Sequence, residues 1–307
     1  MENFFLVFNH TLFHATIRAS TPILYATLSC VLTQQANILN VGVEGAMLSS
    51  AFVAVYVSFT TGSWAAALLA AIATGVAISA FMAIAHLRYG ADIFVVGMGV
   101  NMLALGVTRF LMQRLLGISG MFYDQAIVPL PRIKFDADLG PVLNSMLNDY
   151  SLFEPLGIAL VFVIAYALYR TVWGLRLRGV GLNPMAAETA GINVTMRKFE
   201  VMIWSGILGG MAGAYLSLGY SRMFVENMTN GRGFMGVAAM FFGGANPVLG
   251  WVGCLIFGFA DSLASRLQSF GMPPQFILAI PFVVTVGVLA MAMMRANRRE
   301  LRRKSAI

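Results

Sequence analysis

Charged residues are scarce in this chain. They make up 11% of its 307 residues, whereas a soluble domain averages about 25%. Hydrophobic residues make up 59%, and the mean hydropathy is +0.78. The apolar runs leave no polar stretch between them that is large enough to fold as a soluble domain. The composition therefore predicts one membrane-embedded unit, residues 1–307, that crosses the bilayer many times.

Cysteine is nearly absent too. The two cysteines, Cys30 and Cys254, both fall in apolar runs, where a lone cysteine acts as a small packing residue. Two such residues do not make a disulfide framework. No group of histidine, cysteine and carboxylate residues has the spacing of metal ligands, so we expect no metal site.

Motifs for nucleotide chemistry are missing as well. No GxxxxGK[ST] sequence occurs, so the chain has no phosphate-binding loop of its own. Residues 231–236 match GxGxxG literally, but they follow a polar loop and lack a surrounding βαβ unit, which argues against a dinucleotide site. No nucleophile has an evident base beside it. We therefore predict that the chain is not an enzyme and binds no cofactor itself.

The net charge of +7 raises the question of nucleic acid. The basic residues, however, lie at the edges of apolar runs and in the C-terminal tail, and no basic patch alternates with aromatic residues. We expect no nucleic-acid partner. The first residues lack the basic region and cleavage site of a signal peptide, so they read as a lead-in to the first apolar run.

Apolar runs of helical length predict an all-α transmembrane bundle of about nine spans, with eight to ten as the range. The runs cover residues 15–36, 40–59, 64–86, 93–116, 153–172, 199–219, 233–244, 248–267 and 275–294. The run 233–244 is short for a crossing at about 1.5 Å per residue. A broken or re-entrant segment is the alternative there.

Basic residues set the expected orientation, because cytoplasmic loops are enriched in Lys and Arg. In a nine-span bundle, 12 of the 20 basic residues fall on one face. They are Arg88, Arg170, Arg176, Arg178, Arg197, Lys198, Arg295, Arg298, Arg299, Arg302, Arg303 and Lys304. The loop 117–152 on the other face carries four acids against two bases. We therefore expect an external N-terminus and an external loop 117–152, with the C-terminus in the cytoplasm.

Two glycine-rich segments resemble each other at an offset of 188 residues: LNVGVEGAM at 39–47 and MTNGRGFM at 228–235. In the nine-span arrangement they face opposite ways. That is the pattern of an inverted-topology repeat, which places the pathway of a transporter at the repeat interface. The repeat halves would be about 20–116 and 199–294. Chance similarity between glycine-rich spans is the alternative.

Residues 173–198 form a basic segment between two apolar runs. Asn183 suits an N-cap and Pro184 the first position of a helix. The short helix that they predict ends at Gly191, which suits the C′ position. Its small, close-packing face is predicted to hold Ala186, Ala187 and Ala190. A helix this short is not stable alone, so we expect it to dock against something in the water beside the membrane.

A few polar side chains lie within the apolar runs, where a charge is costly. Glu44 is either a pathway or gate residue, or a structural acid held by helix N-terminal amides or by a neighbour such as Arg88. Asn101 either lines a pore or ties two helices through an amide hydrogen bond. With depth and polarity as the guide, the predicted pathway lining is Asn37, Asn40, Glu44 and Asn101.

Two further sets of residues have structural roles by default. Asp261 and Arg266 are expected to form ion pairs with other helices. Small residues allow helices to approach closely, which is the role predicted for Gly206, Gly209, Gly210 and Gly213.

Three stretches resemble permeases of ATP-binding-cassette (ABC) importers of the branched-chain amino acid/ribose type. They are ILNVGVEGAMLSSAF at 38–52, GLRLRGVGLNPMAAETAGINV at 174–194 and GRGFMGVAAMFFGGANPVLG at 231–250. The resemblance spans nearly the whole chain and is nearest to the nucleoside-type branch, with the sugar branch second. That branch usually reads Gly-Glu-Asn-Pro, whereas this chain has Leu182 in place of the acid. The departure puts in doubt a role for that carboxylate at the ATPase contact.

The resemblance implies a transport subunit of the bacterial plasma (inner) membrane that uses ATP bound by another subunit. The implied partners are a cytoplasmic ABC ATPase, a second permease, which is either a paralogue or a copy of this chain, and an external substrate-binding protein or lipoprotein. The cytoplasmic coupling segment would be 173–198. The residues implied in coupling to the ATPase are Gly181, Asn183, Pro184, Ala186, Ala187, Ala190 and Gly191.

Two other functions remain open from the residues. A secondary transporter driven by an ion gradient needs titratable groups deep in its spans, and Glu44 and Asp261 are the strongest candidates. A membrane scaffold without transport activity would have no use for an exposed Asn-Pro-capped helix.

Overall fold

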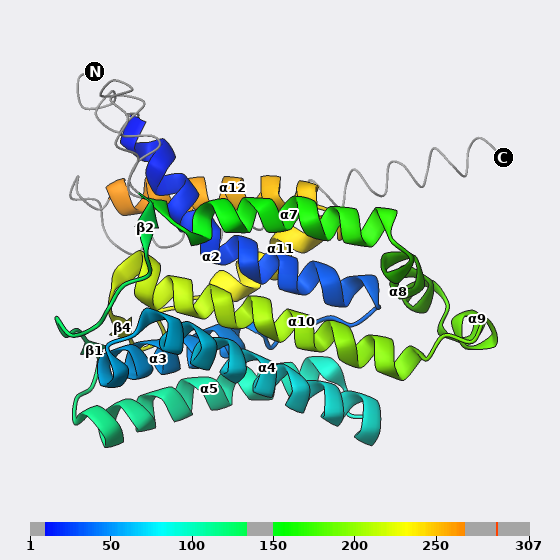
Figure 1. The fold of residues 1–307 in the computed structure, drawn as a ribbon, viewed down its shortest axis with the longest axis horizontal. Helices are drawn as coiled ribbons and strands as arrows, with labels where there is room; N and C mark the ends of the chain where they lie inside the picture. Colours follow the sequence, from blue (N-terminus) through cyan, green and yellow to red (C-terminus); the bar gives the residue numbers. More distant parts are fainter. Residues whose placement is uncertain (1–9, 134–149, 268–286, 288–307) are drawn as a thin grey trace.

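The computed structural model describes residues 10–133, 150–267 and 287. The described chain is mainly helical, and most of its helices lie side by side along one direction (Figure 1). Almost all of the predicted ninth span, 275–294, the basic tail, and part of the loop 117–152 lie outside the described residues.

Four long helices form the first half of the chain. They are α2 (His10–Gln35), α3 (Val43–Thr61), α4 (Trp64–Tyr89) and α5 (Ile93–Leu116). The second half contains α7 (Phe153–Arg170), α8 (Val172–Leu182), α9 (Pro184–Thr189), α10 (Val194–Ala214), the π-helix η1 (Tyr215–Ser221), α11 (Arg232–Phe242) and α12 (Pro247–Leu267). The helices α3, α4 and α5 each end at a glycine with left-handed backbone angles, a conformation that glycine adopts without strain.

Four strands of two residues each depart from the all-α prediction. They are β1 (Met121–Phe122), β2 (Arg132–Ile133), β3 (Tyr150–Ser151) and β4 (Phe224–Val225). Strand β1 pairs antiparallel with β4, and β2 pairs antiparallel with β3. The strands lie together at one end of the bundle, and α8 and α9 lie at the other end (Figure 1).

Six helical segments of the described chain are long and apolar enough to cross a membrane: α3, α4, α5, α7, α10 with η1, and α12. Helix α11 has 11 residues and is about 16 Å long at 1.5 Å per residue. A bilayer core is roughly 30 Å thick. The run 233–244 therefore forms a half-length helix, as the alternative reading of the sequence proposed. The nine-span count and the inverted repeat stay predictions.

Helix α2 is long but carries many hydroxyl groups and one proline. It packs against α10, α11 and α12, and its central residues are buried. Its threonine hydroxyls donate hydrogen bonds to helix carbonyls one turn earlier, which satisfies them inside the bundle. Pro22 has no N–H for the carbonyl of Arg18, and the Tyr215 hydroxyl oxygen lies 3.3 Å from that carbonyl. A polar, proline-containing helix can therefore occupy the core.

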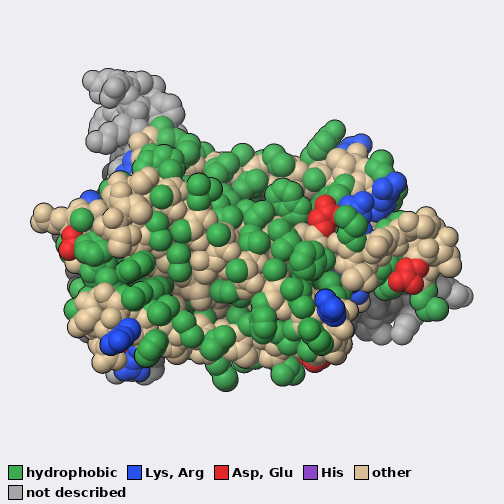
Figure 2. Space-filling view, turned by 60° about the horizontal axis from the view of Figure 1, so that its bottom comes forward, with side chains coloured by type: hydrophobic (Ala, Val, Ile, Leu, Met, Phe, Trp, Pro, Cys, Tyr) green, Lys and Arg blue, Asp and Glu red, His purple; other side chains and the backbone are tan. Residues whose placement is uncertain are grey.

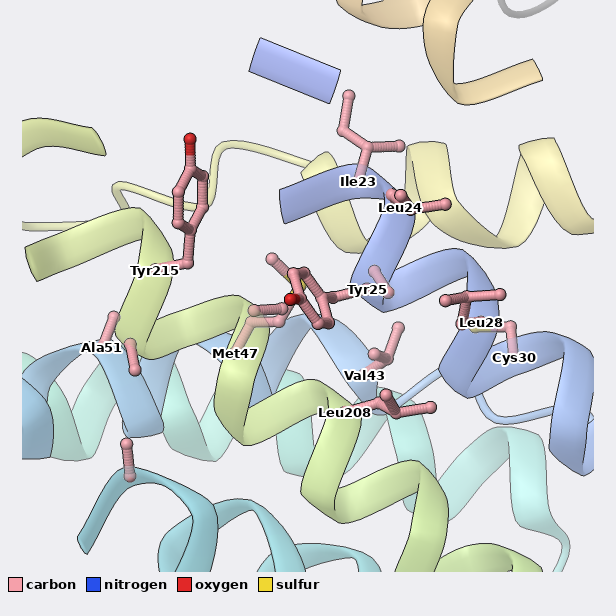
Figure 3. Close-up of a cluster of buried hydrophobic side chains, with 14 of the residues drawn as sticks. Ile23, Leu24, Tyr25, Leu28, Cys30, Val43, Met47, Ala51, Leu208 and Tyr215 are labelled. Carbon is pink, nitrogen blue, oxygen red and sulfur yellow. The ribbon is translucent and has the colours of Figure 1, made fainter. Parts of the chain in front are cut away.

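The hydrophobic core lies where α2, α3 and α10 meet (Figure 3). Tyr25, Met47 and Leu208 contribute side chains from these three helices, and Tyr25 and Met47 are fully buried. The Tyr25 hydroxyl donates to the carbonyl oxygen of Phe153 at 2.8 Å, which attaches the start of α7 to the core. The core thus holds together elements that are far apart in the sequence.

Helix α10 approaches α4 until backbone touches backbone. A Cβ atom at Gly206 would lie 2.7 Å from the carbonyl oxygen of Gly75, and one at Gly210 would lie 2.7 Å from that of Ala71. A Cβ at Gly209 would meet no described atom closer than 3.6 Å. The predicted packing role is therefore confirmed for Gly206 and Gly210, but Gly209 needs no such space.

Replacing Gly206 with alanine is expected to destabilise the folded chain, because the backbone of Gly75 cannot move aside. Overpacking of this kind costs about 1–3 kcal/mol. Gly209→Ala is the matched control on the same turn and should be neutral or stabilising, since alanine favours a helix over glycine. Thermal unfolding of the two purified variants in detergent measures the difference. Equal melting temperatures would contradict the close contact.

Hydrophobic side chains cover the middle of the molecular surface, and charged side chains gather towards its ends (Figure 2). The end that carries α8 and α9 contains Arg88, Arg170, Arg176, Arg178, Arg197 and Lys198. A surface with an apolar middle and polar ends fits a bundle whose middle lies in lipid.

Candidate functional site

Helices α8 and α9 project from one end of the bundle (Figure 1). Asn183 separates them, and its side-chain oxygen accepts a hydrogen bond from the amide of Ala186 at 3.1 Å. Pro184 follows as the first residue of α9. The predicted N-cap and N-terminal proline are therefore confirmed as local structure.

The end of α9 is fixed equally well. Gly191 has a φ of +77°, and its amide donates to the Glu188 carbonyl at 2.9 Å. The next amide, that of Ile192, donates to the Ala187 carbonyl at 3.0 Å. These two bonds form a Schellman motif, which confirms Gly191 as the C′ residue.

The small face of α9 is narrower than predicted. Ala187 is buried in a cluster with Val180 of α8 and Val194 of α10, whereas Ala186 and Ala190 are exposed. Helix α9 has only six residues, and they point to all sides of the helix. Ala187 alone is therefore enough to pack α9 against the rest of the chain. The other two alanines are available to a partner.

Two large apolar side chains at the junction of α8 and α9 are exposed. Leu182 is 87% exposed and Met185 is 79% exposed. They lie beyond the end of the bundle, next to the basic residues of α8. Adjacent apolar side chains in this position are a natural surface for a protein partner.

Gly181 connects this projecting segment to the bundle. A Cβ atom at Gly181 would fall on the carbonyl oxygen of Gln35, at the C-terminal end of α2. A Cβ at Gly179, one half-turn earlier in α8, would meet no described atom within 4 Å. Helix α8 therefore contacts α2 through backbone atoms at Gly181.

Glu44 lies deep in the bundle, in the first turn of α3, and is 8% exposed. Its two carboxylate oxygens accept hydrogen bonds from the amides of Gly231 at 2.8 Å and Gly233 at 2.6 Å. These amides lie at the start of α11, where helix N–H groups lack partners and attract negative charge. The backbone amides of the GxGxxG stretch therefore bind a carboxylate of the same chain.

Asn101 of α5 likewise binds a backbone amide in the first turn of α3. Its side-chain oxygen accepts from the amide of Gly45 at 2.8 Å, and its nitrogen donates to the carbonyl of Val41 at 3.1 Å. The tie between helices is confirmed as one of the two roles considered for Asn101. Of the two structural partners considered for Glu44, the helix N-terminal amides are confirmed, and Arg88 is not the partner that the structure gives.

Glu44 and Asn101 also line one pocket of about 230 Å³. Its other lining residues are Gly45, Leu48, Leu105, Asn227, Thr229, Asn230, Gly231 and Phe234. The N-terminal ends of α3 and α11 both reach this pocket. Of the residues predicted to line a pathway, the structure therefore brings together Glu44 and Asn101.

The other two predicted lining residues lie elsewhere. Asn40 is 1% exposed, and its amide nitrogen donates to the Ser205 hydroxyl of α10 at 2.7 Å. Asn37 is exposed and has a φ of +56° in the turn that ends α2. Asn37 thus occupies a left-handed cap position, which asparagine tolerates.

Several polar residues at the core were not singled out from the sequence. Glu154 of α7 is 3% exposed and accepts a hydrogen bond from the Tyr215 hydroxyl at 2.7 Å. Arg232 of α11 pairs with Asp261 of α12 at 2.9 Å, which confirms the expected ion pair of Asp261. The pocket residues Thr229 and Phe234 were also missed, although both lie within the glycine-rich segment 228–235.

A family profile described as the branched-chain amino acid transport system permease component matches residues 12–289. The guanosine ABC transporter permease protein NupQ of Bacillus subtilis is 35% identical over 92% of each chain. The nucleoside ABC transporter permease protein NupC of Lactococcus lactis is 32% identical over 90% of each chain. TsgC13 of Haloferax volcanii, provisionally named a glucose ABC transporter permease protein, is 30% identical over 96% of this chain and 95% of its own.

A solved ABC transporter in an inward-facing conformation has a similar fold. The TM-score is 0.51 with 17% sequence identity, over 90% of this chain and 84% of the other. At this sequence identity the likeness shows a shared fold.

Proposed function

Because this chain belongs to the permease family of branched-chain amino acid transport systems, we propose that it forms one half of the pathway of an ABC importer for nucleosides. A separate ATPase would supply the energy. The relatives that are named for nucleosides match nearly the whole chain, which supports this substrate class. A sugar importer is the second candidate, supported by the relative that is named for glucose.

The exposed corner of α8 and α9 is the observation that carries the proposed coupling. This corner holds the exposed side chains of Leu182 and Met185, and its backbone is fixed by caps at both ends of α9. Preorganised apolar groups lose little freedom on binding. The ATPase would dock on this corner, with Asn183, Pro184 and Gly191 shaping the docking helix.

A chain of contacts leads from this corner to the pocket. Gly181 of α8 abuts the end of α2 at Gln35. The side chain of Gln35 donates to the carbonyl of Ala245, just beyond the end of α11, at 2.7 Å. Helix α11 begins at the pocket, where Glu44 holds it. Movement of the docked ATPase would shift the balance between two arrangements of these contacts.

The proposed orientation places α8 and α9 in the cytoplasm, where the ATPase is, and the strands outside. The basic residues at the α8 and α9 end support it. The N-terminus would then be external, in the plasma membrane of a bacterium. The nine spans and the inverted repeat belong to the same proposal. The contact between Glu44 in one glycine-rich segment and Gly233 in the other supports a repeat interface at the pathway.

An ion-coupled secondary transporter has less support. The carboxylate of Glu44 binds two helix amides, and that of Asp261 binds Arg232. Both acids are thus in structural contacts, rather than placed to bind and release an ion. A second permease and an external binding protein complete the proposed importer.

Uptake of labelled guanosine into proteoliposomes that contain this chain, its second permease, the ATPase and the binding protein tests the function. Met185→Asp should lower ATP-dependent uptake by roughly 30-fold or more, the effect of losing an interface hot spot. The control is Met196→Asp, the same change at a side chain of α10 that is 66% exposed and lies outside the α8 and α9 corner, and its uptake should match that of the native chain. Uptake that persists without the ATPase and follows a proton gradient would overturn the proposal.

A further inference from the structure

The pocket beside Glu44 offers a solute both polar groups and an aromatic surface. We propose that this pocket holds the base of the nucleoside during its passage, with Phe234 stacking on the base and Thr229 and Asn230 bonding its polar edge. The inference rests on the proposed function and adds a substrate contact within the permease itself.

Thr229 supplies the first argument. Its side chain is fully buried, at 0% exposed, and its hydroxyl oxygen has no hydrogen-bond partner within the part of the chain that the structure describes. Thr229 lines the pocket. A buried hydroxyl without a partner costs about 1–3 kcal/mol. A solute that accepts or donates one hydrogen bond there would remove this cost.

Phe234 supplies the second argument. It lies in the first turn of α11, lines the pocket, and is 41% exposed. Leu48 and Leu105 are the other large apolar residues of the lining. Flat aromatic bases stack on such rings, and the stacking tolerates different bases because each has a π-face. The apolar part of the lining therefore suits a planar ring.

The remaining polar groups determine which kind of ring compound fits. Asn227 and Asn230 also line the pocket, and an asparagine side-chain amide both donates and accepts hydrogen bonds. A nucleobase edge presents donors and acceptors in the same way. Glu44 also lines the pocket, and the negative charge of its carboxylate repels anions. The pocket therefore favours a neutral nucleoside over a nucleotide.

The position of the pocket fits a pathway rather than a lipid-facing surface. Leu105 is 43% exposed and Phe234 is 41% exposed, so the pocket is open on the side of α5 and α11. Polar groups in this position would be costly against hydrocarbon. The pocket has a volume of about 230 Å³, whereas a typical closed ligand site has roughly 300–1,000 Å³. A small pocket that is open on one side also allows the solute to leave. We expect the second permease to form the opposite wall.

Equilibrium binding to the complete transporter in nanodiscs, without the external binding protein, tests this assignment. The probes are labelled guanosine, labelled ribose and guanosine monophosphate as a competitor. Phe234→Ala should weaken guanosine binding by about 5- to 150-fold, the range for one stacked base, and should leave ribose binding unchanged. Phe234→Tyr should restore guanosine binding. Guanosine monophosphate should fail to compete.

Thr229→Val separates a solute contact from a structural role. The two side chains have the same shape, so the folded chain should be as stable as before or more stable, while guanosine binds more weakly. The control for the ring is Phe241→Ala, on the same helix, 49% exposed and outside the pocket. It should leave guanosine binding unchanged.

The results distinguish failure of the proposed function from failure of the pocket assignment alone. If the native transporter carries another solute but no nucleoside, the proposed function is wrong. If the native transporter carries guanosine, but Phe234→Ala binds guanosine with the same affinity as the native chain and Phe241→Ala, the pocket assignment is wrong. Guanosine uptake without any measurable binding to the native transporter would overturn the pocket assignment as well.

Discussion

Glu44→Ala is expected to be among the most destabilising single substitutions in this chain. The alanine would leave the amides of Gly231 and Gly233 without their carboxylate partner. An unsatisfied buried donor costs about 1–3 kcal/mol, so two of them would cost about 2–6 kcal/mol. Glu44→Gln should have an intermediate effect, because its oxygen can replace one carboxylate oxygen while its NH₂ group, a donor, would face the other backbone amide. Melting temperatures in detergent would rank the three chains.

Glu226 offers the matched control. Its carboxylate also accepts a hydrogen bond from a backbone amide, that of Gly120, at 2.9 Å. The same carboxylate forms an ion pair with Arg109 at 3.5 Å. These groups lie at the strand end of the bundle, where Arg109 is largely exposed. Water can replace the lost bonds there, and exposed ion pairs contribute about 0–1 kcal/mol. A loss of stability as large for Glu226→Ala as for Glu44→Ala would show that the depth of Glu44 does not matter.

Gly181→Ala is the second substitution with a large expected effect, and it acts on transport. The new methyl group would push α8 away from the carbonyl of Gln35. The bundle itself should still fold, because the contact lies at its end. If this contact carries the coupling, a loss of about 1–3 kcal/mol would reduce ATP-driven uptake by roughly 5- to 150-fold. Uptake and ATP hydrolysis are measured on the same proteoliposomes.

Gly179→Ala controls for the loss of a glycine in α8. Its methyl group would enter open space, so uptake should match the native chain. ATP hydrolysis without uptake in Gly181→Ala would be the sign of uncoupling. Native uptake by Gly181→Ala would exclude this contact from the coupling route.

The sequence predicted the parts of the candidate sites that depend on local signals. The cap at Asn183, the proline at the start of α9 and the turn at Gly191 all act within a few residues. Helix α8 was missed because its 11 residues contain three glycines, which weaken the helical signal. Its burial against the neighbouring helices outweighs that propensity.

Long-range partners could not be predicted in the same way. The amides that bind Glu44 lie 187 and 189 residues further along the chain. The sequence offered a capped acid as one role for Glu44, but nothing in it identified the helix that is capped. The buried pair of Glu154 and Tyr215, 61 residues apart, was missed because Glu154 lies at the edge of an apolar run. An acid at that position usually faces water.

The distance along the chain between Glu44 and its partners also determines when their contact can form during protein synthesis. The amide of Gly231 is made 187 residues after Glu44, which takes about 9 to 37 seconds at roughly 5–20 residues per second. During this interval the Glu44 carboxylate of α3 cannot form its hydrogen bonds to α11, because α11 has not yet been synthesised. Only the N-terminal amides of α3 itself and nearby water can stabilise the charge. The ribosome therefore completes most of the chain before the first glycine-rich segment can reach its final position, so the closing of the pocket is a late step in assembly.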